Sequence, residues 1–127
     1  MLDLSQKQTE QKLKLTYAAL DLSVVLSWRF PATEEHVGYQ IDKYRKTEGF
    51  RLSAGLNILT GIRDGDFGVE GNPLSSNPDS PDYRADWKDA LKGNPTAAKI
   101  IEDLAYTVFE ETLVMPDREP TVPFVKS

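Results

Sequence analysis

Apolar positions recur among polar ones from Leu13 to Phe30, within a segment, residues 5–30, that contains no Gly, Pro or Asn. A helix accommodates such a run and would end at Phe30, because Pro31 disfavours a helical conformation in the residue before it. We therefore predict one long helix over residues 5–30, with Ser5 as its N-cap. At 100° per residue this helix would carry two apolar faces, which suits a central position or an oligomer interface.

A half-buried strand is the alternative for the second half of this segment. From Leu20 to Phe30 every even position is apolar and most odd positions are polar, which is the period of a strand with one buried face. No obvious turn residue lies between Tyr17 and Leu20, and one strand across the whole segment would exceed the usual ~3 to 10 residues. The helix is therefore the favoured interpretation, and the strand remains open.

A second helix is predicted from Thr33 to about Lys46. Glu34 and Glu35 fall in its first turn, where the helix dipole favours negative charge, and Gly49 is a suitable C-terminal stop. Three apolar residues with the spacing i, i+4 and i+7 are predicted to form its inner face: Val37, Ile41 and Tyr44.

Residues 50–63 fit two secondary structures. Their apolar positions alternate like those of a strand, but four of them also recur at helical spacing. Gly55 and Gly61 each weaken a helix by roughly 1 kcal/mol relative to Ala, whereas Asp64-Gly65 would suit a hairpin turn after a strand. We favour the helix over the strand in this segment.

An irregular acidic loop is predicted over residues 64–82, because Asn-Pro and Ser-Pro pairs punctuate it. A short helix should follow over about residues 83–92. The clearest amphipathic pattern begins at Thr96 and ends before Pro116. On this last helix Asp103 and Glu110 are predicted to lie on the face turned to solvent.

These elements predict a mainly α protein, a small bundle of about four to five helices with a long irregular acidic loop. The alternative is an α+β fold with residues 20–30 and 50–63 as strands. We expect a single helical domain over residues 1–115, since ~100 to 150 residues is the commonest domain size. Residues 116–127 contain Pro120 and Pro123 and are predicted to form an extended tail.

Charge is divided unevenly along the chain. Residues 1–63 carry nine Lys or Arg against seven Asp or Glu, and residues 64–127 carry six against thirteen. The net charge of -5 disfavours nucleic-acid binding, which usually begins with a basic face. The best candidate for such a face is a short basic cluster, but Asp42 and Glu48 dilute it. The cluster consists of Lys43, Arg45, Lys46 and Arg51.

Candidate catalytic chemistry is sparse. Cysteine is absent, and His36 is the only histidine, with no good metal ligand three or four residues away. We expect no cofactor, and an enzyme is less favoured than a non-enzymatic protein. The alternative is a small metal-assisted hydrolase or nucleotide-handling bundle, which would need four carboxylates to converge: Glu34, Glu35, Asp103 and Glu110.

The favoured function is a non-enzymatic, acidic protein that acts through protein–protein contacts, as an accessory subunit or regulator. The predicted contact residues lie in the short acidic helix and in the tail: Asp86, Trp87, Asp89, Phe124 and Val125. The partner is another protein, and the first helix would also suit a homo-oligomer. We expect a cytoplasmic protein that does not enter a membrane, because no apolar stretch reaches the ~20 residues of a membrane span.

Overall fold

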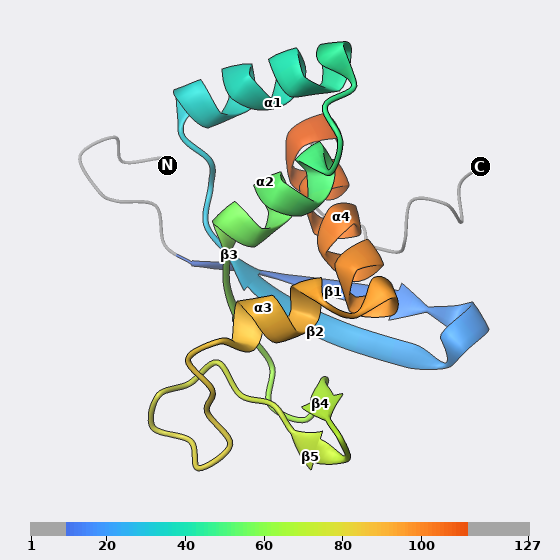
Figure 1. Ribbon diagram of the computed structural model, residues 1–127, viewed down its shortest axis with the longest axis vertical. Helices are drawn as coiled ribbons and strands as arrows, with labels where there is room; N and C mark the ends of the chain where they lie inside the picture. The colour runs from blue at the N-terminus through green and yellow to red at the C-terminus, as the bar shows by residue number, and fades with distance from the viewer. Residues whose placement is uncertain (1–9, 112–127) are drawn as a thin grey trace, which may run out of the picture.

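The computed structural model describes residues 10–111. Within them, the chain forms a three-stranded antiparallel sheet, a small two-stranded sheet and four α-helices (Figure 1). In chain order the elements are β1 (Gln11–Tyr17), the 3-10 turn η1 (Ala18–Leu20), β2 (Leu22–Trp28), α1 (Thr33–Arg45), α2 (Phe50–Ile58), β3 (Leu59–Ile62), β4 (Gly68–Val69), β5 (Asn72–Pro73), α3 (Trp87–Lys92) and α4 (Pro95–Glu110).

The prediction of a mainly α bundle is wrong, because the protein is α+β. The segment predicted as one long helix over residues 5–30 is a β-hairpin where the structure describes it. In this hairpin Leu13 pairs with Leu26, and Leu15 pairs with Val24. These four side chains are buried on one face of the sheet, so the period of two dominates over the helical spacing.

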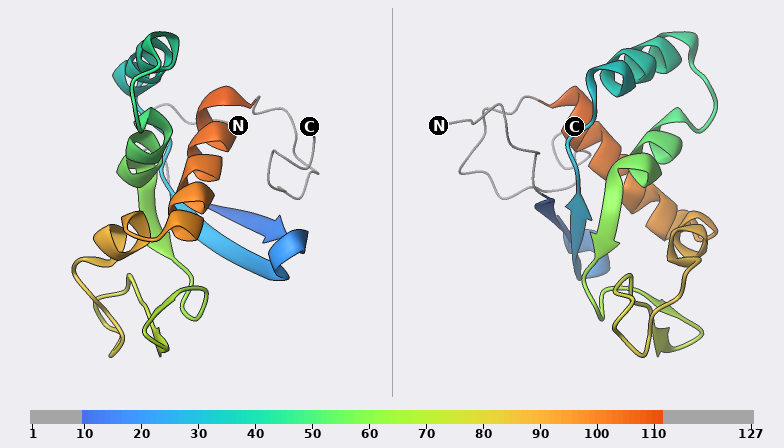
Figure 2. Two further views of the ribbon diagram at one scale, coloured as in Figure 1. Left: turned by 45° about the vertical axis from the view of Figure 1, so that its right-hand side comes forward. Right: turned by 90° about the vertical axis from the view of Figure 1, so that its left-hand side faces the viewer.

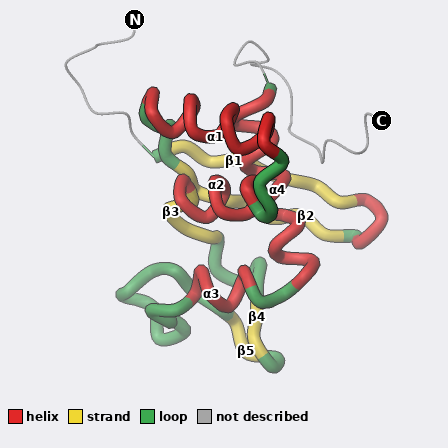
Figure 3. The backbone as a smooth tube through the Cα atoms, turned by 45° about the horizontal axis from the view of Figure 1, so that its top comes forward, coloured by secondary structure: helices red, strands yellow, loops and turns green. Residues whose placement is uncertain are grey.

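The turn that joins β1 to β2 carries no Gly, Pro or Asn. Residues Ala18–Leu20 make a single 3-10 turn, which Figure 3 shows in red between the two yellow strands. Asp21 then adopts the left-handed conformation, with φ 48° and ψ 49°, and its backbone N–H donates to the carbonyl of Ala18. Asp tolerates this region better than most residues, and the chain reverses here without the usual turn signal.

Residues 50–63 combine both predicted structures. They form helix α2 and then strand β3, which pairs antiparallel with β2 and makes β2 the central strand of the sheet. The helix prediction is therefore right for Phe50–Ile58 and wrong for Leu59–Ile62. Gly55 allows α2 to approach α4 closely, because a Cβ at this position would lie 2.4 Å from the carbonyl oxygen of Ile101.

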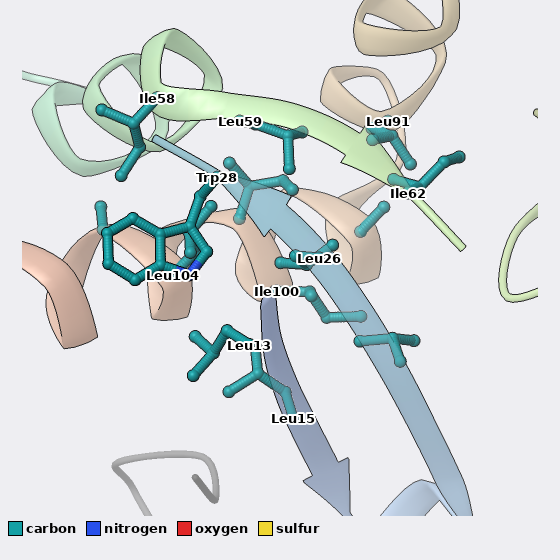
Figure 4. Close-up of a cluster of buried hydrophobic side chains, with 14 of the residues drawn as sticks. Leu13, Leu15, Leu26, Trp28, Ile58, Leu59, Ile62, Leu91, Ile100 and Leu104 are labelled. Atoms are coloured by element: carbon teal, nitrogen blue, oxygen red, sulfur yellow. The ribbon is translucent and has the colours of Figure 1, made fainter. Parts of the chain in front are cut away.

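The hydrophobic core lies between one face of the sheet and helix α4. Figure 4 shows Leu13, Leu15, Leu26 and Trp28 of the sheet directed toward the side chains of α4. Ile101, Leu104 and Ala105 of α4 are fully buried in this core, as the amphipathic pattern predicts.

The predicted acidic loop is only partly irregular. A short hairpin, β4–β5, lies within it, and side chains tie the loop to the sheet. Asp66 accepts a hydrogen bond from the backbone N–H of Val25 at 2.8 Å, and Ser76 accepts one from the N–H of Ile62 at 2.9 Å. Its polar residues therefore satisfy backbone N–H groups of strands β2 and β3.

Helix α4 begins at Pro95, and the side chain of Asn94 caps it by accepting from the N–H of Ala97 at 3.0 Å. Across residues 10–111, no helix has the length and apolar character to cross a membrane.

Candidate functional site

Helix α1 lies at one end of the long axis of the molecule and forms its outermost element (Figures 1 and 2). Only one of its residues, Tyr39, is buried. The ring of Tyr39 stacks on Phe109 of α4, with 4.4 Å between ring centroids, and meets Phe50 of α2 edge to face at 5.2 Å. This aromatic contact fixes which side of α1 faces the body of the protein.

The predicted inner face of α1 in fact faces outward. Val37 is 54% exposed, Ile41 is 44% exposed and Tyr44 is 87% exposed. We call these three residues the outer stripe. Five large apolar side chains are exposed between residues 10 and 111, and three of them form this stripe. Isolated exposed apolar residues are ordinary, but a contiguous apolar patch indicates a binding surface.

The start of α1 is held by an amino-end clamp of Arg29, Glu35 and Asn57. Arg29 donates to both carboxylate oxygens of Glu35, at 2.8 and 2.9 Å, and Asn57 donates to the same carboxylate. Glu35 also accepts from the backbone N–H of Ala32 at 2.8 Å, which caps the helix. The hydrogen bonds from Arg29 lower the pKa of Glu35 to about 2, against the effect of desolvation.

The other end of α1 is held by a carboxyl-end clamp of Tyr39, Lys43, Arg51 and Glu110. Lys43 and Arg51 donate to the carboxylate of Glu110 at 2.6 and 2.9 Å, and the Tyr39 hydroxyl donates to it as well. Burial alone would raise the pKa of Glu110, but these hydrogen bonds outweigh it and lower the pKa to about 2. Burial and the bond to Glu110 raise the pKa of the Tyr39 hydroxyl.

A cleft of about 470 Å³ lies under α1, between the two clamps. Its lining includes Asp42 of α1, Phe50 of α2, Lys88 of α3 and Phe109 of α4. Desolvation lowers the pKa of Lys88, whose ammonium donates to the carbonyl of Leu56 at 2.7 Å. The cleft thus leaves α1 attached to the body through the two clamps and through the rings of Tyr39 and His36, which both contact Phe109.

The four carboxylates of the metal hypothesis have separate partners. Glu35 and Glu110 belong to the two clamps, and Glu34 is exposed on α1. Asp103 lies on α4 next to the sheet. In the part of the chain that the structure describes, no three His, Cys, Asp or Glu side chains are placed to hold a metal ion. The convergence that this alternative requires is therefore not found there.

The expectation that Asp103 lies on a solvent-facing side of its helix is wrong. Asp103 is 5% exposed, and its carboxylate accepts a hydrogen bond from the Tyr17 hydroxyl at 2.8 Å. Desolvation raises the pKa of Asp103, although the bond from Tyr17 and the charge of Lys99 oppose this. Glu110 is likewise a structural residue, since its side chain is 7% exposed.

The contact residues predicted in the short helix differ in their accessibility. Asp86 and Asp89 are exposed, and Asp86 pairs with Arg84 at 2.9 Å. Trp87 is 8% exposed and belongs to the core, so its ring is not displayed at the surface. Phe124 and Val125 lie outside the described residues. A role in partner binding stays a prediction for all five.

The basic cluster is divided between two roles. Lys43 and Arg51 neutralise Glu110 in the carboxyl-end clamp, whereas Arg45 and Lys46 are exposed at the end of α1. The two exposed cations are followed closely by Glu48. They do not by themselves make the broad basic face that nucleic-acid binding usually requires.

Comparison with protein-family models, with curated proteins and with solved structures finds no match to this chain. The candidate site therefore rests on geometry alone. Sequence reasoning identified the spacing of the outer stripe but assigned it to the core. Tyr39 lies on the opposite side of the same helix and is the residue that could have indicated the true inner face, because an aromatic residue there can anchor the helix.

Proposed function

We propose that this protein is non-enzymatic and acts through protein–protein contacts, as an accessory subunit or regulator, with the outer face of α1 as its contact surface. The observation that carries the proposal is the outer stripe, which is exposed although the residues opposite it are fixed to the body. A cytoplasmic location forms part of the proposal and agrees with the absence of cysteine.

The spacing of the outer stripe supports recognition of a helix or a groove. Apolar residues at i, i+4 and i+7 form one continuous ridge on a helix, which is the usual way in which a helix docks into an apolar surface. Tyr44 is the most exposed of the three, and Tyr is among the residue types that contribute most to binding energy at interfaces.

The two clamps support the same proposal. They hold α1 in one orientation before any partner arrives, and a pre-ordered helix loses less conformational entropy on binding. A helix anchored through charged groups and through the rings of Tyr39 and His36 has its apolar side chains left for another contact.

The test is capture of partners from the source lysate by the full chain, compared with the variant Ile41→Arg. Ile41 is exposed, so we expect the variant to remain folded and to lose the partners that bind the wild type. Tyr83→Arg is the matched control, because Tyr83 is also exposed but lies outside α1. Equal capture by all three forms would contradict the proposal.

A further inference from the structure

We propose that the outer stripe of α1 binds the same stripe of a second copy of this chain, with the two helices antiparallel about a twofold axis. This inference rests on the proposed function, because it names the partner of the surface described there. It is carried by the distribution of charge around the outer stripe, which is complementary to itself in one orientation only.

Charges of opposite sign lie at the two ends of one flank of the stripe. Glu34 is in the first turn of α1 and Arg45 in its last turn, and both are exposed. They are eleven residues apart in the sequence, which is close to three full helical turns, so both project from the same side of the helix. Neither forms an ion pair with another residue of the 10–111 segment.

An antiparallel twofold arrangement brings these charges together. Such a symmetric interface places each flank against the same flank of the other copy, in reverse order. Glu34 then meets Arg45 of the second copy, and Arg45 meets Glu34 of the second copy, within the reach of long side chains. In a parallel twofold arrangement each flank would instead face the opposite flank of the other copy, which carries the uncharged Thr33 and Gln40, so Glu34 and Arg45 would find no opposite charge.

The apolar residues fit the same register. With the twofold axis midway between Val37 and Tyr44, Val37 packs against Tyr44 of the second copy, and Ile41 lies beside the axis. The helix dipoles are also opposed in this arrangement, with the acidic first turn of each helix beside the basic last turn of the other.

The position of α1 makes this approach accessible. It lies at one end of the molecule, and the acidic loop with β4 and β5 lies at the opposite end (Figure 1). Two copies joined at α1 therefore keep these loops far apart, which limits repulsion between chains that each carry a net charge of -5. One helix face is smaller than a standard interface of about 1,200 Å² or more, so we expect a weak dimer that forms at micromolar concentration or above.

The experiment is sedimentation equilibrium of the full chain over a range from about 5 μM to 1 mM. The wild type should change from monomer to dimer within this range. Glu34→Lys and Arg45→Glu should each raise the dissociation constant by roughly tenfold, because each change breaks two symmetric ion pairs and creates repulsion. The double variant, with both changes, should recover dimerisation close to that of the wild type.

Two further variants complete the design. Ile41→Arg should abolish association by placing charge beside the axis. Lys92→Glu is the matched charge reversal, because Lys92 is exposed on α3, away from α1, and it should leave the dissociation constant unchanged. Circular dichroism of every variant confirms that α1 is still helical.

Failure of this inference is distinguishable from failure of the proposed function. A wild type that stays monomeric at 1 mM, or a double variant that is not restored, overturns the antiparallel pairing. If the monomer still captures a different protein in an Ile41-dependent manner, the proposed function stands and only the choice of partner is wrong. If neither association nor capture depends on Ile41, both are wrong.

Discussion

The carboxyl-end clamp offers the sharpest test of how α1 is held. Glu110 accepts hydrogen bonds from Lys43, Arg51 and Tyr39, and its own side chain is 7% exposed. Glu110→Gln keeps the volume of the side chain and an oxygen that can accept from Tyr39, but it removes the charge. The variant therefore isolates the ionic part of the clamp.

The pKa of Glu110 sets the size of the effect. A lowering from 4.5 to about 2 corresponds to about 3 kcal/mol of extra interaction with the ionised form. Lys43 is 44% exposed and Arg51 is 37% exposed, so solvent screens part of this interaction. Lys43 and Tyr39 belong to α1 whereas Arg51 belongs to α2, so only part of this interaction holds α1. We expect Glu110→Gln to destabilise the docking of α1 by about 1 kcal/mol at pH 7.

The effect should depend on pH in a defined direction. Because folding lowers the pKa of Glu110, its contribution is fully present above about pH 4.5 and is lost as the pH falls toward 2. The wild type should therefore approach the variant in stability at acid pH, as its own carboxylate takes up a proton.

Amide hydrogen exchange followed residue by residue is the suitable assay, because α1 can open without unfolding of the core. A loss of about 1 kcal/mol should speed exchange in α1 by roughly fivefold, while amides of β2 change little. Glu48→Gln is the control, since this substitution removes the same charge at an exposed residue. Unchanged exchange in α1 would refute the role of Glu110 as a clamp.

Two predictions concern the core. Gly55→Ala should destabilise the protein by about 2 kcal/mol in urea unfolding, because the new Cβ would meet the carbonyl of Ile101 at 2.4 Å. Gly38→Ala on α1 is the control and should stabilise the protein by about 0.5–1 kcal/mol, because nothing lies within 4 Å of its Cβ. Equal effects at both sites would contradict the close approach of α2 and α4. Tyr17→Phe should cost about 1–3 kcal/mol at pH 7, because it removes the hydrogen bond to the buried carboxylate of Asp103. In thermal unfolding this cost should shrink when Asp103→Leu is also present, and an unchanged cost would argue against the pair.

The hairpin shows why the fold class could not be predicted correctly from this sequence. The alternation at Leu13, Leu15 and Tyr17, and again at Val24 and Leu26, was visible. The helix is nevertheless the favoured prediction, because no Gly, Pro or Asn separates the two halves. The turn exists, with Asp21 in the left-handed conformation, and tertiary packing against α4 stabilises a reversal that local sequence barely signals.

The orientation of α1 could not be predicted for a different reason. The stripe of Val37, Ile41 and Tyr44 has the spacing of a buried helix face. The sequence does not indicate which residues form ion pairs with Glu35 and Glu110. Those partners, Arg29 and Arg51, lie 6 and 59 residues away. Ion pairs between distant segments are set by the fold, and carboxylates that appear available for metal binding turn out to be engaged in them.

The geometry of α1 also explains why an apolar stripe remains in solvent. Full burial of side chains such as Val37 or Ile41 would gain roughly 1.5–3 kcal/mol each, so the helix has a strong tendency to turn this face inward. Such a rotation would take Tyr39 and Lys43 away from Glu110 and leave its buried carboxylate with Arg51 of α2 alone. It would also break the bonds that Arg29 and Asn57 make to Glu35. The clamps thus oppose the rotation. It follows that Glu110 controls the exposure of Ile41 from the opposite side of the helix, and that Glu110→Gln should weaken contacts made by the outer stripe although Glu110 lies outside it.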